Sequence, residues 1–290
     1  MKIFILNKSK QSIGGGWTFM RNFVKYAGRA ETVVASPDMM LSAGAKIFFI
    51  AGATMIERED VEVAKKLGMK IVLRVDNIPR NSRNRNTGTS RLKDFAHMAD
   101  LVVYQSKWAK EYIRPFLGKD GPVILNGADS EIFNMLEHAQ PKEGHRQYLY
   151  AQYNRDETKQ WHQAWYEYIV ASRNWPNMAH LWIVGQFSPE QIEYNFDFFS
   201  GEQYRYVGVL EDPRDFAEYL RGTDVLLLPY FNDACSNTLI EARLCGVERI
   251  WHNGTGGNDE IMATPVPKLT AQHMADQYLK EFHKLLNEKK

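Results

Sequence analysis

The chain has 290 residues, 44% of them hydrophobic and 24% charged, a composition typical of a globular protein long enough for two domains. Its net charge of +1 provides no overall field to attract nucleic acid or anionic lipid, so any basic surface must be local. The two cysteines, Cys235 and Cys245, are too few for a disulfide framework and favour a reduced, cytoplasmic location. We see neither a signal peptide nor a segment that approaches a transmembrane span.

Short apolar runs alternate with helical patterns along the whole chain. The runs are apolar throughout rather than alternating, as expected for parallel strands that are covered on both faces. Repeated strand–helix units predict an α/β fold with parallel sheets. The expected strands are 2–6, 32–35, 46–50, 70–75, 101–105 and 122–125, then 147–153, 180–184, 204–207, 225–228 and 249–252.

Helix signals lie between these runs. Apolar residues recur at helical spacing over 17–27. Thr54 with Glu57 suggests a capping box, and Gly68 suggests the end of that helix. Asp212 before Pro213 is typical of an N-cap and first turn. A last helix is expected over about 270–287.

Eleven strands in one sheet would be unusual, so two domains are expected. The polar stretch 129–146 separates the two series of strands. We predict an N-terminal Rossmann-like domain over 1–135, a linker over 136–146 and a C-terminal Rossmann-like domain over 147–290. The last helix either stays in the second domain or crosses back to the first. Ligands in such sheets bind outside the carboxyl ends of the strands, which for two domains predicts a central cleft.

The segment NDACSNTLIEARLCG, 232–246, follows an apolar run and carries the clearest chemical signal. Ser236 stands where a helix N-cap belongs, and the N–H groups of Asn237 and Thr238 would begin an anion site. Asp233 and Glu241 bracket that site and would accept hydrogen bonds from hydroxyls. Such a site would suit a ligand that has phosphates in the middle and a polyol at each end, and a nucleotide sugar is a ligand of this kind. The plainer interpretation is a helix cap with two solvated acids.

Three other segments bear on this interpretation. SIGGGWTF, 12–19, allows backbone approach to a phosphate, but Phe19 replaces the third glycine of a dinucleotide fingerprint. Arg155 and Lys159 follow a strand and could neutralise a diphosphate. NGTGGNDEI, 253–261, is a further glycine-rich turn after a strand. Ordinary turns and an exposed helix start remain the alternatives.

Taken together, these segments resemble family 4 of the retaining glycosyltransferases. The similarity implies a GT-B-like fold, in which two Rossmann-like domains with parallel sheets face a central cleft. The segments that carry the resemblance are VILNGADSEIF (123–133), LWIVGQF (181–187), YRYVGVL (204–210), TDVLLLPYFNDACSNTLIEARLCG (223–246) and GTGGNDEI (254–261).

The resemblance also implies roles for residues. Glu241 would bind the nucleotide ribose, and Asp233, where the family has Glu, would bind the donor sugar. Arg155 and Lys159 would bind the diphosphate; they lie one residue closer than the family's pair, and Gln160 replaces a glycine. The other implied substrate-binding positions are Gly15, Gly16, Gly185, Val207, Ser236, Asn237 and Thr238. Asp76 stands near the place of a histidine that many relatives carry beside the reacting carbon.

The implied activity is metal-independent, retaining transfer of a hexosyl group from a UDP- or GDP-sugar to an acceptor hydroxyl. No cofactor is expected, because protein cations would replace the metal, and no D-x-D pair follows a strand. We expect no structural metal and no nucleic acid partner. The alternatives are a non-catalytic relative that binds a nucleotide sugar and an NAD-linked oxidoreductase.

The acceptor is not identified by the sequence, and a glycan or a lipid-linked acceptor would both be consistent with it. The arginine-rich segment 80–91 is either a contact for an acidic acceptor or a solvated loop. The basic and aromatic segment 106–119 would suit peripheral membrane contact, but its apolar positions are more typical of a core helix. Those positions are Trp108, Tyr112, Ile113 and Phe116.

Overall fold

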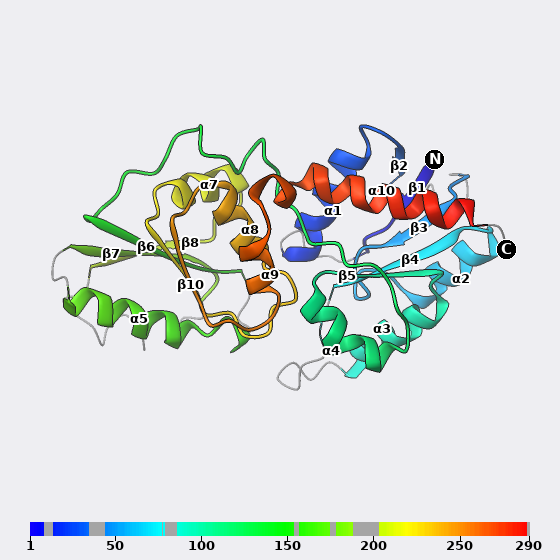
Figure 1. Cartoon of the computed structure of the whole chain (residues 1–290), viewed down its shortest axis with the longest axis horizontal. Coiled ribbons are helices and arrows are strands. Elements are labelled where there is room, and N and C mark those ends of the chain that lie inside the picture. The colour runs from blue at the N-terminus through cyan, green and yellow to red at the C-terminus, as the bar shows by residue number, and fades with distance from the viewer. Residues whose placement is uncertain are drawn as a thin grey trace. The chain divides into compact units, whose positions relative to one another are not determined.

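The computed structural model describes residues 1–8, 14–34, 44–76, 78, 86–153, 157–174, 178–187 and 203–288. Arg155 and the arginines of 80–85 lie outside these residues. The chain forms two compact units, one of Met1–Gly127 with Asp259–Lys290 and one of Ala128–Asn258 (Figure 1). In the part of the chain that the structure describes, no helix combines the length and apolarity needed to cross a membrane.

The first unit is a parallel sheet between two layers of helices. Its strands follow the order β2-β1-β3-β4-β5. Helices α1 and α10 cover one face, and α2, α3 and α4 cover the other (Figure 1). The strands are β1 (Lys2–Ile5), β2 (Thr32–Val34), β3 (Ile47–Ile50), β4 (Lys70–Val75) and β5 (Leu101–Tyr104). The helices are α1 (Gly15–Ala27), α2 (Arg58–Lys66), α3 (Asn86–Met98), α4 (Lys107–Leu117) and α10 (Ala271–Asn287).

Two local predictions for this unit are wrong. Residues 122–125 form no strand and make only a single bridge, between Tyr104 and Val123. The proline at position 122 removes an N–H that a ladder would need. The N-cap of α2 is Glu57, three residues after the predicted cap Thr54, and the Glu57 N–H donates to Asp60 Oδ2 at 2.9 Å. The predicted end of the helix is confirmed, because Gly68 has a φ of +75°.

The second unit repeats the parallel architecture. Its sheet order is β10-β9-β6-β7-β8, with α5 on one face and α7 and α8 on the other (Figure 1). The strands are β6 (Arg146–Gln152), β7 (Ala179–Gly185), β8 (Tyr204–Gly208), β9 (Val225–Leu228) and β10 (Arg249–His252). The helices are η3 (Glu157–Lys159, a 3₁₀ turn), α5 (Trp161–Asn174), α7 (Pro213–Arg221) and α8 (Asn237–Leu244). After β10 the chain returns to the first unit through α9 (Asn258–Ala263) and the 3₁₀ turn η5 (Val266–Leu269).

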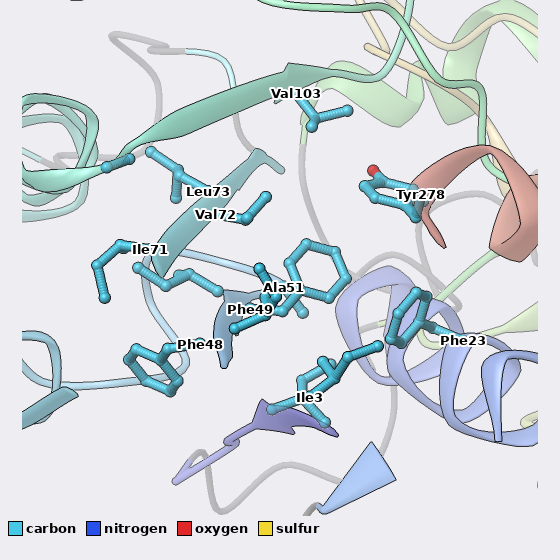
Figure 2. Packing of buried hydrophobic residues seen from close by; sticks show 14 of the residues in the cluster. Ile3, Phe23, Phe48, Phe49, Ala51, Ile71, Val72, Leu73, Val103 and Tyr278 are labelled. Carbon is cyan, nitrogen blue, oxygen red and sulfur yellow. The ribbon is translucent and has the colours of Figure 1, made fainter. Parts of the chain in front are cut away.

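The last helix crosses back to the first unit, which corrects the predicted domain over 147–290. Tyr278 and Phe282 of α10 pack on Phe49 of β3, with ring centroids 5.1 and 5.2 Å apart. Phe23 of α1 lies 4.9 Å from the same ring, and Figure 2 shows Phe49 beside Phe23 and Tyr278. The apolar stripe of α10 therefore completes the core over β3, which α1 alone would leave partly uncovered.

The predicted linker belongs to the second unit, whose boundary lies after Gly127 rather than after residue 135. Gln140 donates its N–H to the Glu218 carbonyl of α7 at 2.9 Å. The Arg221 side chain donates to the carbonyl oxygens of Ile132 and His138. Because these contacts use backbone groups, the polar composition of the stretch does not reveal them.

Candidate functional site

The N-terminus of α8 forms one side of the candidate site. Strand β9 ends at Leu228, and Ser236 then caps α8, with Oγ accepting the Leu239 N–H at 3.3 Å. The cap is 2% exposed. Asn237 and Thr238 occupy the first turn, where backbone N–H groups and the helix dipole favour negative charge. The predicted cap is confirmed.

Asp233 lies on the loop before this cap and is held from three directions. Its Oδ2 lies 3.1 Å from Lys159 Nζ, and its Oδ1 accepts the Cys235 N–H at 3.3 Å. Its carbonyl accepts the Gly257 N–H at 2.8 Å. A Cβ at Gly256, where φ is +74°, would collide with the same carbonyl oxygen. The carboxylate is therefore fixed in place before any ligand binds.

Lys159 reaches Asp233 from the 3₁₀ turn η3, at the carboxyl end of β6. Its Nζ lies 3.6 Å from the centroid of the Tyr230 ring, a cation–π geometry. Its carbonyl accepts the Tyr150 hydroxyl at 3.0 Å. The Lys159 and Asp233 side chains are 16% and 21% exposed, so the pair is only partly screened by water. The structure thus joins two predicted residues that lie far apart in sequence.

The glycine-rich turn 253–257 braces the loop that carries Asp233. Asn253 Nδ2 donates to the Pro229 carbonyl at 2.8 Å, and Thr255 Oγ1 donates to the Tyr230 carbonyl at 3.3 Å. Thr255 Oγ1 also accepts the N–H of Asn232, whose φ is +50°. This role of Asn253 and Thr255 was missed. Its only sequence signal is a glycine turn that follows a neighbouring strand.

Glu241 is buried inside α8, at 8% exposure. Burial, together with the nearby Glu241 carboxylate, raises the pKa of Tyr153 above its usual value. Burial likewise raises the pKa of Tyr230, against a hydrogen bond from Thr238. The plainer interpretation of two solvated acids is wrong, because Glu241 is buried among tyrosines and Asp233 is paired with Lys159.

Gly185 of β7 and Val207 of β8 lie on neighbouring strands, at the same carboxyl edge of the sheet. Gly185 ends β7 with a φ of +114°, and a Cβ there would collide with the Gln152 carbonyl oxygen. Its own carbonyl accepts the Tyr206 hydroxyl at 3.0 Å. The register of β7 and β8 shifts at this point, so that Val207 is the residue without a partner across the ladder. The backbone at this edge is therefore irregular in both strands.

The predicted residues of the first unit gather at the carboxyl edge of its own sheet. Asp76 follows β4, and its Oδ1 accepts the Ala53 N–H at 3.2 Å. Gly15 and Gly16 begin α1, and a Cβ at Gly16 would lie 3.2 Å from Met55 Sδ. A Cβ at Gly52 would lie 2.5 Å from Asp76 Oδ2 and 2.9 Å from the same sulfur atom. Asp76 thus caps the turn after β3 and shares Met55 as a neighbour with the glycines.

Arg74 supports this edge and was missed. It is 2% exposed, and it donates to the Ala51 carbonyl at 2.8 Å, to Gln105 Oε1 at 2.9 Å and to Asn126 Oδ1 at 3.0 Å. Its guanidinium also lies 3.9 Å from the Phe19 ring centroid. One charged residue within the apolar run KIVLRV was the available signal. Arg74 ties the ends of three strands together.

Among the described residues, no group of three or more His, Cys, Asp and Glu side chains is arranged to hold a metal ion. The carboxyl edge of the second sheet carries the Lys159 ammonium, the carboxylates of Asp233 and Glu241, and the backbone N–H groups that begin α8. Such a set can bind phosphate through the cation and the helix N–H groups, and hydroxyls through the carboxylates.

Two parallel five-stranded sheets with helices on both faces define the GT-B fold, and the predicted fold class is confirmed. Sucrose-phosphate synthase from Thermosynechococcus elongatus matches with a TM-score of 0.73 and 14% identity, over 99% of this chain and 100% of that chain. The Anabaena protein HepE, solved with UDP-glucose, matches with a TM-score of 0.66 and 14% identity, over 99% and 91%.

A third solved structure has the same fold. It is a Listeria monocytogenes protein described as a UDP-N-acetylglucosamine 2-epimerase, with a TM-score of 0.64 and 13% identity, over 100% of this chain and 97% of that chain. The chain matches no family model and no curated protein. At these identities the structural similarity establishes the fold, and the chemistry has to be argued from the site.

Proposed function

We propose that the protein is a glycosyltransferase that moves a sugar from a nucleotide diphosphate sugar to an acceptor hydroxyl. The observation that carries this proposal is the joining of the Lys159 ammonium, the Asp233 carboxylate and the capped start of α8 at one sheet edge. A cation and a helix N-terminus suit a diphosphate, and the carboxylate suits sugar hydroxyls. The HepE structure, solved with UDP-glucose, adds support from a similar fold.

The difficult step of this reaction is cleavage of the bond between the anomeric carbon and the phosphate oxygen. Negative charge then develops on the leaving diphosphate, and we assign its stabilisation to Lys159, Arg155 and the N–H groups of Asn237 and Thr238. One preorganised donor of this kind is worth about 3 kcal/mol of barrier, roughly a hundredfold in rate. The acceptor proton would pass to the phosphate oxygen that leaves.

The finer assignments rest on the sequence resemblance. We propose retention of the anomeric configuration, transfer of a hexosyl group and neutralisation of the diphosphate by protein cations without a metal. Glu241 is the proposed ribose ligand, and Gly185 and Val207 border the proposed nucleotide pocket. Gly15, Gly16, Asp76 and the cytoplasmic location stay predictions.

The first test is binding of UDP, GDP, ADP and NAD, measured by calorimetry with EDTA and again with Mg²⁺. We expect one nucleoside diphosphate to bind in EDTA, and Lys159→Ala to weaken that binding at least tenfold. Lys142→Ala is the matched control, because Lys142 pairs with Asp224 elsewhere in the same unit. Binding of NAD alone would exclude a glycosyltransferase and favour the oxidoreductase.

Turnover separates the remaining alternatives. Sugar transfer or donor hydrolysis would exclude a non-catalytic relative. A nucleotide-sugar epimerase is a second candidate, because the Listeria protein, which is described as an epimerase, has the same fold. Conversion of UDP-N-acetylglucosamine to its epimer without any acceptor, followed by NMR, would establish that candidate in place of transfer.

We also propose that α4 contacts a membrane that carries a lipid-linked acceptor. Ile113 is buried, but Tyr112 is 52% exposed and Phe116 39% exposed, which corrects the core interpretation for these two positions. Trp108 stacks on Tyr112 at 5.2 Å, and Arg114 is exposed on the same helix. Exposed aromatic and basic side chains suit an anionic bilayer surface. Sedimentation with phosphatidylglycerol vesicles should fall in Tyr112→Ala, but not in Tyr166→Ala on α5.

A further inference from the structure

The pairing of Asp233 with Lys159 raises a problem for phosphate binding at this lysine. A carboxylate next to an ammonium cancels much of the charge that would attract a phosphate. The Lys159 Nζ lies 3.1 Å from Asp233 Oδ2, so a phosphate oxygen that contacts Nζ comes within about 6 Å of a negative charge. At this spacing and partial exposure, repulsion lowers phosphate affinity by about tenfold.

Asp233 cannot relieve this repulsion by turning away. Its Oδ1 accepts the Cys235 N–H, its carbonyl accepts the Gly257 N–H, and Gly256 packs against it without space for a Cβ. The preceding residue, Asn232, is held in a left-handed conformation by Thr255. Rotation of the side chain would break the hydrogen bond to Cys235 and the pair with Lys159 together. The charge of Asp233 therefore stays beside the phosphate position.

The repulsion differs between the two nucleotide forms that the proposed reaction uses. In the intact donor the distal phosphate is esterified by the sugar and carries one negative charge. In the released nucleoside diphosphate the same phosphate is terminal, and its second ionisation, with a pKa of about 6, adds nearly a full charge at neutral pH. The sugar hydroxyls of the donor can also donate to the carboxylate, and the free nucleotide has no such group there.

We propose that Asp233 discriminates between the intact donor and the spent nucleoside diphosphate, favouring capture of the first and release of the second. This inference rests on the proposed function. Asp233 acts on the donor by accepting from a sugar hydroxyl, and on the product by repelling the terminal phosphate that Lys159 attracts. Lys159 and Asp233 thus form a pair that attracts the donor more than the product.

The test compares dissociation constants for UDP and UDP-glucose, or for GDP and GDP-mannose where the binding series selects guanine. For Asp233→Asn we expect about tenfold tighter binding of the diphosphate and about tenfold weaker binding of the sugar nucleotide. Their ratio should shift by about a hundredfold. Asp233→Glu keeps the charge, so it should still bind the sugar nucleotide in preference to the nucleoside diphosphate, as the wild type does. Asp224→Asn, which removes the partner of Lys142, should leave the ratio unchanged.

A second measurement needs no variant. The wild-type protein should bind the β-methyl ester of the diphosphate several-fold more tightly than the diphosphate itself, because the ester lacks the additional charge. Equal or tighter binding of the unesterified diphosphate would overturn the proposal. Weaker binding of both ligands in Asp233→Asn would also overturn it, and would leave Asp233 as a residue that only positions Lys159. Absence of any nucleotide binding to wild type would instead remove the proposed function.

Discussion

Gly185 determines how closely β6 and β7 approach at the carboxyl edge of the second sheet. At its φ of +114°, any residue with a side chain would have a strained backbone. A Cβ at this position would in addition overlap the Gln152 carbonyl oxygen. Gly208 on β8 has a φ of +84° but nothing within 4 Å of its Cβ position. Comparing substitutions at these two glycines therefore distinguishes the cost of backbone strain from the cost of steric overlap.

We expect Gly185→Ala to lower the free energy of unfolding by about 3 kcal/mol, and Gly208→Ala by about 1 kcal/mol. Only the first variant has to move the backbone of β6 as well as adopt a strained φ. Urea unfolding followed by circular dichroism measures both values. Equal losses would mean that the overlap relaxes without cost.

Gln160 shows that a residue type can depart from a pattern while the backbone conformation is kept. The resemblance places a glycine at this position, which left the geometry of the loop around Lys159 open. Gln160 has a φ of +52°, a value that glycine adopts freely. The turn after η3 therefore keeps a glycine-like backbone, and Lys159 still reaches Asp233.

His180 predicts a pH dependence of stability. Burial lowers the pKa of His180, although Glu143 at 3.0 Å favours the charged form, and Arg205 opposes it. The folded state therefore binds this proton less well than the unfolded state, whose histidine pKa is about 6.5. The stability from the neutral ring is present above that value and is lost as the pH falls through it.

We expect the free energy of unfolding of wild type to fall between pH 7 and pH 5.5 more steeply than that of His180→Gln. Urea titrations at several pH values measure the two slopes. His180 is the second residue of β7 and lies at the strand end opposite Gly185, so nucleotide binding at pH 7 should be unchanged in the variant. Parallel slopes would show that His180 is protonated equally in both states.

At the scale of elements, α7 and α8 offer two N-caps with different surroundings. Ser236 caps α8 beside Asp233, and Asp212 caps α7, where its Oδ1 accepts the Arg214 N–H at 2.8 Å. Replacing either cap by alanine should cost about 1 kcal/mol of stability. Only Ser236→Ala should also weaken binding of the nucleoside diphosphate, because it disturbs the helix start that we propose as the phosphate site.

Thermal unfolding and calorimetry on the same two variants check this prediction. Equal losses of stability with unequal changes in affinity would assign the α8 N-terminus to the ligand. An equal loss of affinity in Asp212→Ala would mean that the Ser236 cap affects nucleotide binding only through the stability of the protein.

Elements could be predicted from the sequence where local signals agree. The apolar runs identified the strands of both sheets, and Asp212, Ser236 and Gly68 marked helix ends, because caps depend on near neighbours. Residues 122–125 were misassigned, since an apolar run does not reveal how far a ladder extends, and here it stops at the single bridge of Val123 with Tyr104. The exposure of Tyr112 and Phe116 could not be predicted either, because helical spacing identifies an apolar face of a helix but not whether another element covers that face.

For the candidate site, the sequence indicates single residues but not which of them lie in contact. Ser236, Asp233 and Glu241 carry local signals, whereas the pair of Lys159 with Asp233 depends on how β6 and β9 lie side by side in the sheet. The bracing by Asn253 and Thr255, and the role of Arg74 in β4, depend on contacts between segments that lie apart in the sequence. Arg155 lies outside the described residues, so its role stays a prediction.

At the scale of the whole molecule, the path of the chain makes the first unit discontinuous. Its sheet is complete by residue 104, yet its core closes only when α10 is added 167 residues later, at Ala271. The second unit is one continuous segment between these two parts. Folding of the first unit therefore requires both ends of the chain, whereas folding of the second does not.

Phe282→Ala should consequently destabilise one unit and spare the other. Phe282 is fully buried against Phe23 and Phe49, and its removal should cost the first unit about 3–5 kcal/mol. Hydrogen exchange followed by mass spectrometry should show lost protection in α1, β3 and α10, with β6 and β9 unchanged. Lys284→Ala, on the exposed side of the same helix, should leave every element protected as in wild type. Lost protection in β6 and β9 as well would mean that the two units unfold as one, and that the second unit depends on the last helix for its stability.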